Sequence, residues 1–331
     1  MLRLTRPKKR LEKLSKTNNP SIKLRGLMKI LLKNILPDLR SVLNIVALLC
    51  LSVYFIFVPI IKSPSPRQKP NVKAAFVSEP PMPVSKNIPA PQVTATGIYI
   101  TDLKTGQVLL EKNAHTRLKP ASLTKIMTAL VAMDYYNDDS ILLVKNGQNA
   151  NGNTVKLRKG DKLIASDLLY ALLVPSGNDA AVTFAENYPG GYQAFISRMN
   201  SKATEMSLQN THFVNVSGVE SQNHYTSAFD ITVLARAALA RPQFSSIVST
   251  QKITLKSLKG NIYPLESTNL LLGQPGIFGV KTGWTPEAGE CLVILVEKNG
   301  HSVLISILNS KDRFGEAQTL FNWVFENYSW E

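Results

Sequence analysis

The sequence predicts an α+β fold in which an antiparallel sheet is packed between helices, preceded by one transmembrane helix. Three observations lead to this prediction. Strand-like segments occur at both ends of the region that follows residue 93, helical segments fill its middle, and hairpin turns require antiparallel neighbours. Apolar residues make up 44% of the 331-residue chain, which is enough for a sizeable core.

The first strands are expected at residues 97–102 and 107–111, where short apolar runs flank a polar turn. Lys104-Thr105-Gly106 occupies that turn, and its glycine suits a positive φ. Two neighbouring strands joined this closely form a hairpin.

A strongly apolar helix is expected from Ser122, because apolar residues recur at helical spacing after it. These residues are Leu123, Ile126, Met127, Leu130 and Val131. A second helix should start at a Ser166-Asp167 cap, and further helices should fill residues 178–206 and 226–240.

Near the end of the chain, residues 291–296 and 302–308 read as a hairpin around Lys298-Asn299-Gly300. A final helical face follows, formed by Phe314, Ala317, Leu320, Phe321, Val324 and Tyr328. A membrane-surface helix is one interpretation of this face. Its acidic residues Glu316, Glu326 and Glu331 argue against that, because such helices favour Lys and Arg. We expect the helix to pack on the sheet.

The net charge of +15 is unevenly distributed. Residues 1–40 contain twelve Lys or Arg and two acids, so they carry +10, whereas residues 41–331 carry only +5. A tail that binds nucleic acid is one interpretation of this excess. The apolar segment that follows this tail favours a second interpretation. In it the tail stays in the cytoplasm beside a membrane and binds no nucleic acid.

Residues 41–61 contain no charged side chain. As a helix they would span about 31 Å, enough to cross the lipid bilayer. The basic flank should remain cytoplasmic, which places the domain that follows on the other side of the cytoplasmic membrane. A cleaved signal peptide is the alternative, but its best cleavage site, Val72-Lys73-Ala74, is weak and distant. We favour an uncleaved single-pass anchor.

Residues 62–92 form a Pro-rich linker that cannot build a core and favours an extended conformation. Its prolines are Pro64, Pro66, Pro70, Pro80, Pro81, Pro83, Pro89 and Pro91. The predicted globular domain occupies residues 93–331.

The cysteines and histidines predict neither a disulfide nor a metal site. Cys50 lies in the apolar segment and Cys291 in the outer domain, so an intramolecular bridge is implausible. The four histidines are isolated from one another and from acids at ligand spacing.

Three short motifs follow one another along the predicted domain. Ser122 and Lys125 form S-x-x-K, Ser176 and Asn178 form S-x-N, and residues 281–283 form K-T-G. Each is weak alone, but their order and spacing together point to a serine acyl-transfer site.

A serine hydroxyl becomes a nucleophile only when a base removes its proton. Ser122 and Lys125 share a helix face, and free backbone N–H groups at the helix start can stabilise an oxyanion. A neutral lysine at pH 7 costs about 4.6 kcal/mol, which burial and a second cation such as Lys281 can offset. Taken alone, the pair could be a helix cap and a surface lysine.

The other two motifs supply polar groups. Ser176 is a candidate proton shuttle and Asn178 a candidate partner for a substrate amide, although both could simply belong to a polar loop. Lys281 and Thr282 can bind a carboxylate, and Gly283 would let a substrate backbone approach the strand. The earlier Lys104-Thr105-Gly106 precedes the nucleophile and is interpreted as a turn alone.

Over roughly residues 94–327 the sequence resembles the D-alanyl-D-alanine carboxypeptidases, the low-molecular-mass penicillin-binding proteins. The most specific stretches are Tyr99-Ile100-Thr101-Asp102, KPASLTKIMTALVAMD, LLYALLVPSGNDAA, NTHFVNVSGV, HYTSAFD and GVKTGWTPEAGECLV. Val216 departs from the pattern, because the family usually has proline there. We expect a local change in that loop without loss of chemistry.

The resemblance implies a fold like that of β-lactamases and transpeptidases, no cofactor, and a serine mechanism. Ser122 would attack the D-Ala-D-Ala bond of peptidoglycan stem peptides, with Lys125 as base and Ser176 as proton relay. β-Lactam antibiotics would acylate the same serine.

The resemblance also implies how the substrate is held. Asn178 would orient the acyl chain, while Lys281 and Thr282 would bind the terminal carboxylate. The backbone N–H groups of Ser122 and Trp284 would form the oxyanion hole beside Gly283.

Three other functions remain possible at this stage. A DD-endopeptidase would use the same residues on peptidoglycan cross-links. A β-lactamase is less expected, because Glu266-Ser267-Thr268-Asn269 lies too close before Lys281 to supply a hydrolytic glutamate. A wall-binding pseudoenzyme would need neither Lys125 nor Lys281.

Overall fold

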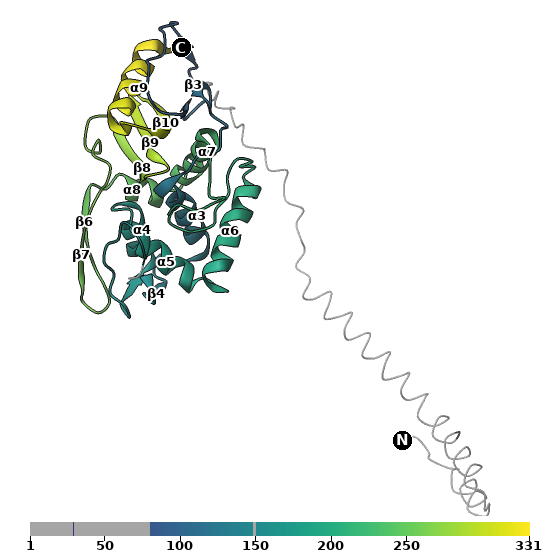
Figure 1. The fold of residues 1–331 in the computed structure, drawn as a ribbon, viewed down its shortest axis with the longest axis vertical. Coiled ribbons are helices and arrows are strands. Elements are labelled where there is room, and N and C mark those ends of the chain that lie inside the picture. Colours follow the sequence, from purple (N-terminus) through teal and green to yellow (C-terminus); the bar gives the residue numbers. More distant parts are fainter. Residues whose placement is uncertain (1–28, 30–79, 148–149) are drawn as a thin grey trace, which may run out of the picture. The chain divides into compact units, whose positions relative to one another are not determined.

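The computed structural model describes Lys29, residues 80–147 and residues 150–331 (Figure 1). The predicted cytoplasmic tail, the transmembrane segment 41–61 and most of the predicted linker therefore lie outside the described residues. Among the residues described, no helix has the length and apolar character needed to cross a membrane.

A five-stranded sheet forms the centre of the domain, with strand order β3-β2-β10-β9-β8 and antiparallel pairing throughout. The pairing places the first long strand beside the last, with Ile100 opposite Ile305. The strands are β2 (Gly97–Asp102), β3 (Val108–Lys112), β8 (Ile277–Thr285), β9 (Gly289–Lys298) and β10 (His301–Ser310). The predicted antiparallel sheet, built from both ends of the domain, is confirmed.

Both faces of this sheet are covered, so successive side chains of a strand enter different cores. On β10, Ile305 packs in the cluster that contains Leu320 of α9 (Arg313–Asn327), whereas Leu304 belongs to the cluster on the opposite side. Figure 1 shows α9 lying against the strands β9 and β10. The final helix therefore packs on the sheet, as expected.

The opposite face carries the remaining helices. They are the 3₁₀ turn η1 (Ala121–Thr124), α3 (Lys125–Tyr135), α4 (Ala165–Leu173), α5 (Asn178–Asn187), α6 (Gly191–Glu205), α7 (Ala228–Leu239) and α8 (Pro242–Val248). Two starts differ from the sequence prediction. Ser122 lies in η1 and the α-helix begins at Lys125, while α4 begins at Ala165 without the expected side-chain cap.

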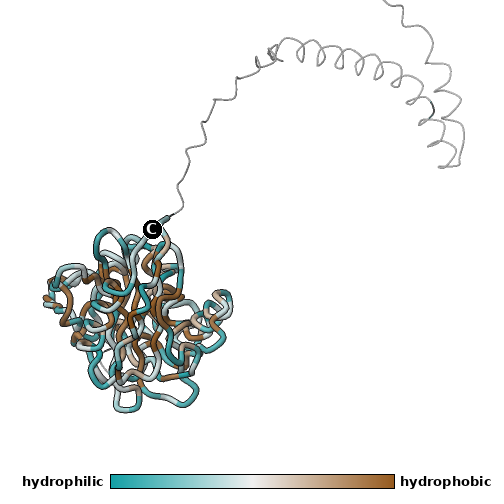
Figure 2. The backbone as a smooth tube through the Cα atoms, turned by 90° about the horizontal axis from the view of Figure 1, so that it is seen from above, coloured by the Kyte–Doolittle hydropathy of each residue, from teal (hydrophilic) through white to brown (hydrophobic). Residues whose placement is uncertain are grey.

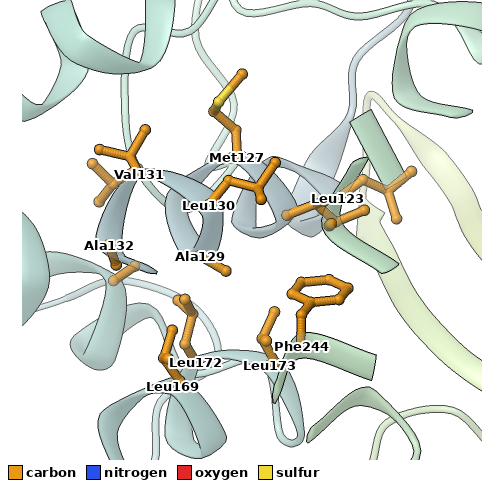
Figure 3. Packing of buried hydrophobic residues seen from close by; sticks show 14 of the residues in the cluster. Leu123, Met127, Ala129, Leu130, Val131, Ala132, Leu169, Leu172, Leu173 and Phe244 are labelled. Atoms are coloured by element: carbon orange, nitrogen blue, oxygen red, sulfur yellow. The ribbon is translucent and has the colours of Figure 1, made fainter. Parts of the chain in front are cut away.

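Helix α3 is the central element of this half, because residues 125–132 are all buried. A helix surrounded by apolar neighbours on all sides belongs in a core. Figure 3 shows Leu169, Leu172 and Leu173 of α4 facing α3, with Phe244 of α8 beside them. In Figure 2 the hydrophobic segments concentrate in the interior of the domain. The helix that begins at Lys125 is thus held on every side.

Three two-stranded sheets flank the centre, and the sequence analysis predicted none of them. They pair β1 (Pro83–Ser85) with β11 (Tyr328–Trp330), β4 (Ile141–Leu143) with β5 (Lys162–Ile164), and β6 (Lys252–Lys256) with β7 (Ile262–Glu266). The β1 pairing means that residues 80–92, predicted as linker, pack on the domain. Ile88 N donates to Asn327 Oδ1 at 2.8 Å, and Trp323 Nε1 donates to the Ile88 carbonyl at 3.1 Å.

Candidate active site

The turn that carries Ser122 connects the sheet side of the domain to the buried helix α3. Ser122 lines a cleft of about 380 Å³. The turn is tight: Ala121 has φ +49°, and Thr124 Oγ1 donates to the Ala121 carbonyl at 2.9 Å. The serine hydroxyl is therefore presented to the cleft by a backbone that is fixed on both sides.

Lys125 lies directly beneath the serine and is fully buried. Its Nζ donates to Ser122 Oγ at 2.8 Å and to the Ser217 carbonyl at 2.9 Å. Burial holds the pKa of Lys125 well below its ordinary value, and the charge of Lys281 lowers it further, against an opposing effect of Asp179. A neutral amine in contact with the serine hydroxyl is a competent base.

Ser176 and Asn178 occupy the connection from α4 to α5. Ser176 is buried in a left-handed conformation with φ +67°. Asn178 begins α5, and its Nδ2 donates to the Asn151 carbonyl. Within the described part of the chain, Ser176 Oγ and Asn178 Oδ1 are buried without a hydrogen-bond partner. Unpaired buried polar atoms are rare, and of these two residues Asn178 lines the cleft.

Strand β8 brings Lys281 and Thr282 to the other side of the site. Lys281 is buried, and its Nζ donates to the Thr282 carbonyl at 3.0 Å. Burial, followed by the charge of Arg313, lowers the pKa of Lys281 to about 7. Thr282 Oγ1 lies 2.6 Å from Thr268 Oγ1, so Thr268 orients that hydroxyl.

Gly283 lies in close contact with the turn that carries Ser122. A Cβ at this position would lie 3.0 Å from the Pro120 carbonyl oxygen and 3.1 Å from Ser122 N. The missing side chain thus allows β8 to pack against this turn, while the predicted approach of a substrate backbone stays a prediction. The same contact places the Ser122 N–H beside the strand that carries Trp284, an exposed residue that lines the cleft.

Residues 151–153 and Arg313 were not singled out by sequence reasoning. Residues 151–153 line the cleft, and Arg313 Nη1 donates to the Gly283 carbonyl at 2.8 Å. Residues 217–220 also line it, and most of them fall within the stretch NTHFVNVSGV. The Asn- and Gly-rich composition of residues 149–153 was a signal for a functional loop. Nothing local indicated Arg313, because it comes from the start of α9.

Asp179 connects the loop that contains residues 151–153 to the site. Its carboxylate is fully buried and accepts from the backbone N–H groups of Val155 at 3.2 Å and Leu157 at 2.9 Å. Asp179 thus fixes the backbone just after residues 151–153, while Asn178 N donates to the Asn153 carbonyl at 2.7 Å.

His224 supports the nucleophile turn from behind. Its Nε2 lies 2.8 Å from Thr124 Oγ1, and its Nδ1 accepts from Val214 N at 3.2 Å. Burial lowers the pKa of His224 to about 4, so the ring is neutral at pH 7. His224, which is isolated from other histidines in the sequence, thus positions the Thr124 hydroxyl that donates to the Ala121 carbonyl.

The loop that contains Val216 borders the same cleft as β8, because Ser217 and Gly218 line it together with Trp284. Asn215 Oδ1 accepts from Ser217 N and Gly218 N, and the carbonyl oxygen of the buried Val216 accepts from Thr128 Oγ1 at 2.6 Å. The loop therefore keeps Ser217 in contact with Lys125. A Cβ on Gly218 would lie 1.7 Å from the Ala121 carbonyl oxygen.

A family model described as D-alanyl-D-alanine carboxypeptidase matches residues 84–312. The chain belongs to the D-alanyl-D-alanine carboxypeptidase family. The predicted family is thereby confirmed. A D-alanyl-D-alanine carboxypeptidase of Bacillus subtilis is 31% identical over 244 residues, which cover 71% of this chain and 63% of the relative. The chain thus spans less than two thirds of that relative's length.

Other relatives agree in family and fold. A D-alanyl-D-alanine endopeptidase of Pseudomonas aeruginosa is 33% identical over 262 residues, covering 76% of this chain and 84% of the relative. The crystal structure of the Streptomyces K15 DD-transpeptidase matches with TM-score 0.68 and 33% identity, over 72% of this chain and all of that one. A Mycobacterium tuberculosis D-alanyl-D-alanine carboxypeptidase structure matches with TM-score 0.69 and 30% identity, over 75% and 96% of the two chains.

The Gly218 contact gives a test of how tightly the nucleophile turn is held. Gly218→Ala should slow acylation by a fluorescent penicillin by about 100-fold, because the added methyl displaces Ala121 and with it Ser122. Gly300→Ala is the matched control, since Gly300 also has a positive φ but its Cβ would meet nothing within 4 Å. Equal acylation rates in the two variants would contradict this view of the turn.

Proposed function

We propose that the chain is a serine DD-carboxypeptidase that removes the terminal D-alanine from peptidoglycan stem peptides through an acyl-enzyme on Ser122. The observation that carries this proposal is the contact between Ser122 Oγ and the buried Lys125, whose pKa is lowered by burial and by Lys281. Membership in the carboxypeptidase family supports it and implies that β-lactams bind at the same site.

In the first half-reaction, Ser122 Oγ attacks the carbonyl carbon of the D-Ala-D-Ala bond while neutral Lys125 takes its proton. The oxyanion accepts hydrogen bonds from the N–H groups of Ser122 and Trp284. Ser176 relays the proton to the leaving nitrogen, the C–N bond breaks, and D-alanine departs. Water then attacks the ester with Lys125 as base, and the proton returns to Ser122 Oγ.

The remaining residues hold the substrate. Lys281 and Thr282 bind the terminal carboxylate at one end of the cleft, where Arg313 adds positive charge. Asn178 binds the amide of the acyl chain through its side-chain carbonyl. Bond cleavage thus takes place at Ser122, and the substrate carboxylate is recognised by β8.

Cleavage of cross-links is the second candidate, because the Pseudomonas aeruginosa relative is named an endopeptidase. Mass spectrometry of purified muropeptides separates the two functions. We expect loss of one D-alanine from pentapeptide monomers and little conversion of cross-linked dimers to monomers. Efficient conversion of dimers would replace the proposal with a DD-endopeptidase, and no turnover of either would support a binding protein.

The role of Lys281 predicts a difference between two substrates. Lys281→Ala should reduce kcat/KM for a peptide with a free terminal carboxylate about 10- to 100-fold more than for its amide, because the amide never had the charged contact. Lys298→Ala, which removes an exposed lysine, is the control.

The same role predicts a pH dependence with a defined sign. The carboxylate needs protonated Lys281, whose pKa is about 7, so the acid-to-amide ratio of kcat/KM should fall as pH rises through 7. Deprotonation of Lys125 affects both substrates and cancels in the ratio. A ratio that stays flat in the unmodified enzyme, with equal losses in Lys281→Ala, would limit Lys281 to tuning Lys125.

We also propose that residues 41–61 anchor the enzyme in the bacterial cytoplasmic membrane with the catalytic domain outside. Support comes from the uncharged sequence and the basic flank that precedes it. N-terminal sequencing of protein extracted from membranes should find the tail 1–40 intact. A mature N-terminus near residue 75 would instead show a removed signal peptide.

A further inference from the structure

One end of the domain carries six exposed cations on two adjoining segments. The segments are the loop before β5 and the end of the β6–β7 hairpin, which extends to the same end of the domain as β4 (Figure 1). We call this set the basic patch. Its members are Lys156, Arg158, Lys159, Lys162, Lys256 and Lys259.

The two segments are joined by hydrogen bonds, so the patch is a fixed surface. Leu258 N donates to the Lys162 carbonyl at 2.9 Å, and Arg158 Nη1 donates to Asn261 Oδ1 at 2.7 Å. A Cβ on Gly160 would lie 3.5 Å from Lys259 Nζ, which places that ammonium group over the loop.

The positive charge of the patch is not neutralised within the described part of the protein. None of its six cations lies within 4 Å of a carboxylate there. Asp161, the one acid within these segments, is buried and accepts from Tyr263 Oη at 2.6 Å and Asn261 Nδ2 at 2.9 Å. Like charges held this close repel, and an anionic partner relieves that repulsion.

The patch continues directly from the active-site cleft. Residues 151–153 line the cleft, and Lys156 follows three residues later, within about 11 Å of Asn153 even along a fully extended chain. Asp179 holds the intervening backbone at Val155 and Leu157. The loop that lines the cleft and the first cation of the patch therefore belong to one short stretch of chain.

We propose that the basic patch binds the carboxylates of neighbouring stem peptides when one stem of a peptidoglycan strand occupies the cleft. This inference rests on the proposed function and adds to it a substrate class, the polymeric wall. Every stem that is not cross-linked ends in a carboxylate, so the polymer presents a row of negative charges. A free stem peptide offers only the carboxylate that β8 binds.

The test compares two triple variants of the full chain. Lys156→Gln/Lys159→Gln/Lys259→Gln removes three charges from the patch but leaves Arg158, which bonds Asn261, and Lys162, which lies in β5. Lys104→Gln/Lys298→Gln/Lys311→Gln removes three exposed charges elsewhere. Both variants retain the basic tail, so its contribution to binding is equal.

D-alanine release is measured from insoluble polymeric peptidoglycan and from a soluble pentapeptide. The patch variant should lose about tenfold in kcat/KM on the polymer and less than about twofold on the peptide, whereas the control should lose neither. Salt should reduce the polymer activity of the unmodified enzyme towards that of the patch variant.

Three results would overturn the inference. Equal losses on both substrates would mean that the lysines act on the catalytic site or on folding. Equal losses in the two variants would mean that only net charge matters. Unchanged polymer activity, together with weaker binding to phosphatidylglycerol vesicles, would assign the patch to a lipid surface. Absence of D-alanine release from either substrate by the unmodified enzyme would instead refute the proposed function.

Discussion

The burial of the Lys125 ammonium group is the constraint on which the rest of the site depends. An ionised amine loses its hydration in the core, so the folded state favours the neutral form unless carboxylates compensate. Here Ser122 Oγ and one carbonyl receive its hydrogen bonds, while the second buried cation, Lys281, disfavours the charge further. Packing of the apolar helix α3 in the core thus favours the neutral amine, which is the form that the proposed role of Lys125 as base requires.

Close backbone contact on two sides keeps the serine above that lysine. Gly283 allows β8 to reach the Pro120 carbonyl oxygen, and Gly218 allows the loop around Val216 to reach the carbonyl of Ala121. Both contacts involve rigid backbone, which cannot move aside for an added side chain. The 3₁₀ turn η1 therefore packs against both β8 and the loop around Val216, which come from distant parts of the chain.

Polar groups behind this arrangement support the shape of the site. The neutral His224 braces the turn through Thr124, and the buried Asp179 ties the loop above Asn178 to the start of α5. The same loop continues into the basic patch, so recognition of a polymer and positioning of Asn178 depend on one segment. Catalytic and binding groups are coupled through backbone hydrogen bonds that no short motif encodes.

The sequence by itself determined the antiparallel sheet, the apolar helix at the nucleophile and the three motifs, because hydrophobic periodicity and short spacing are local properties. It did not determine the 3₁₀ turn at Ser122, the hairpins β4–β5 and β6–β7, or the pairing of β1 with β11. Arg313, Thr268 and His224 were also missed. These features arise from contacts between residues far apart along the chain, and only the tertiary structure decides which distant groups meet.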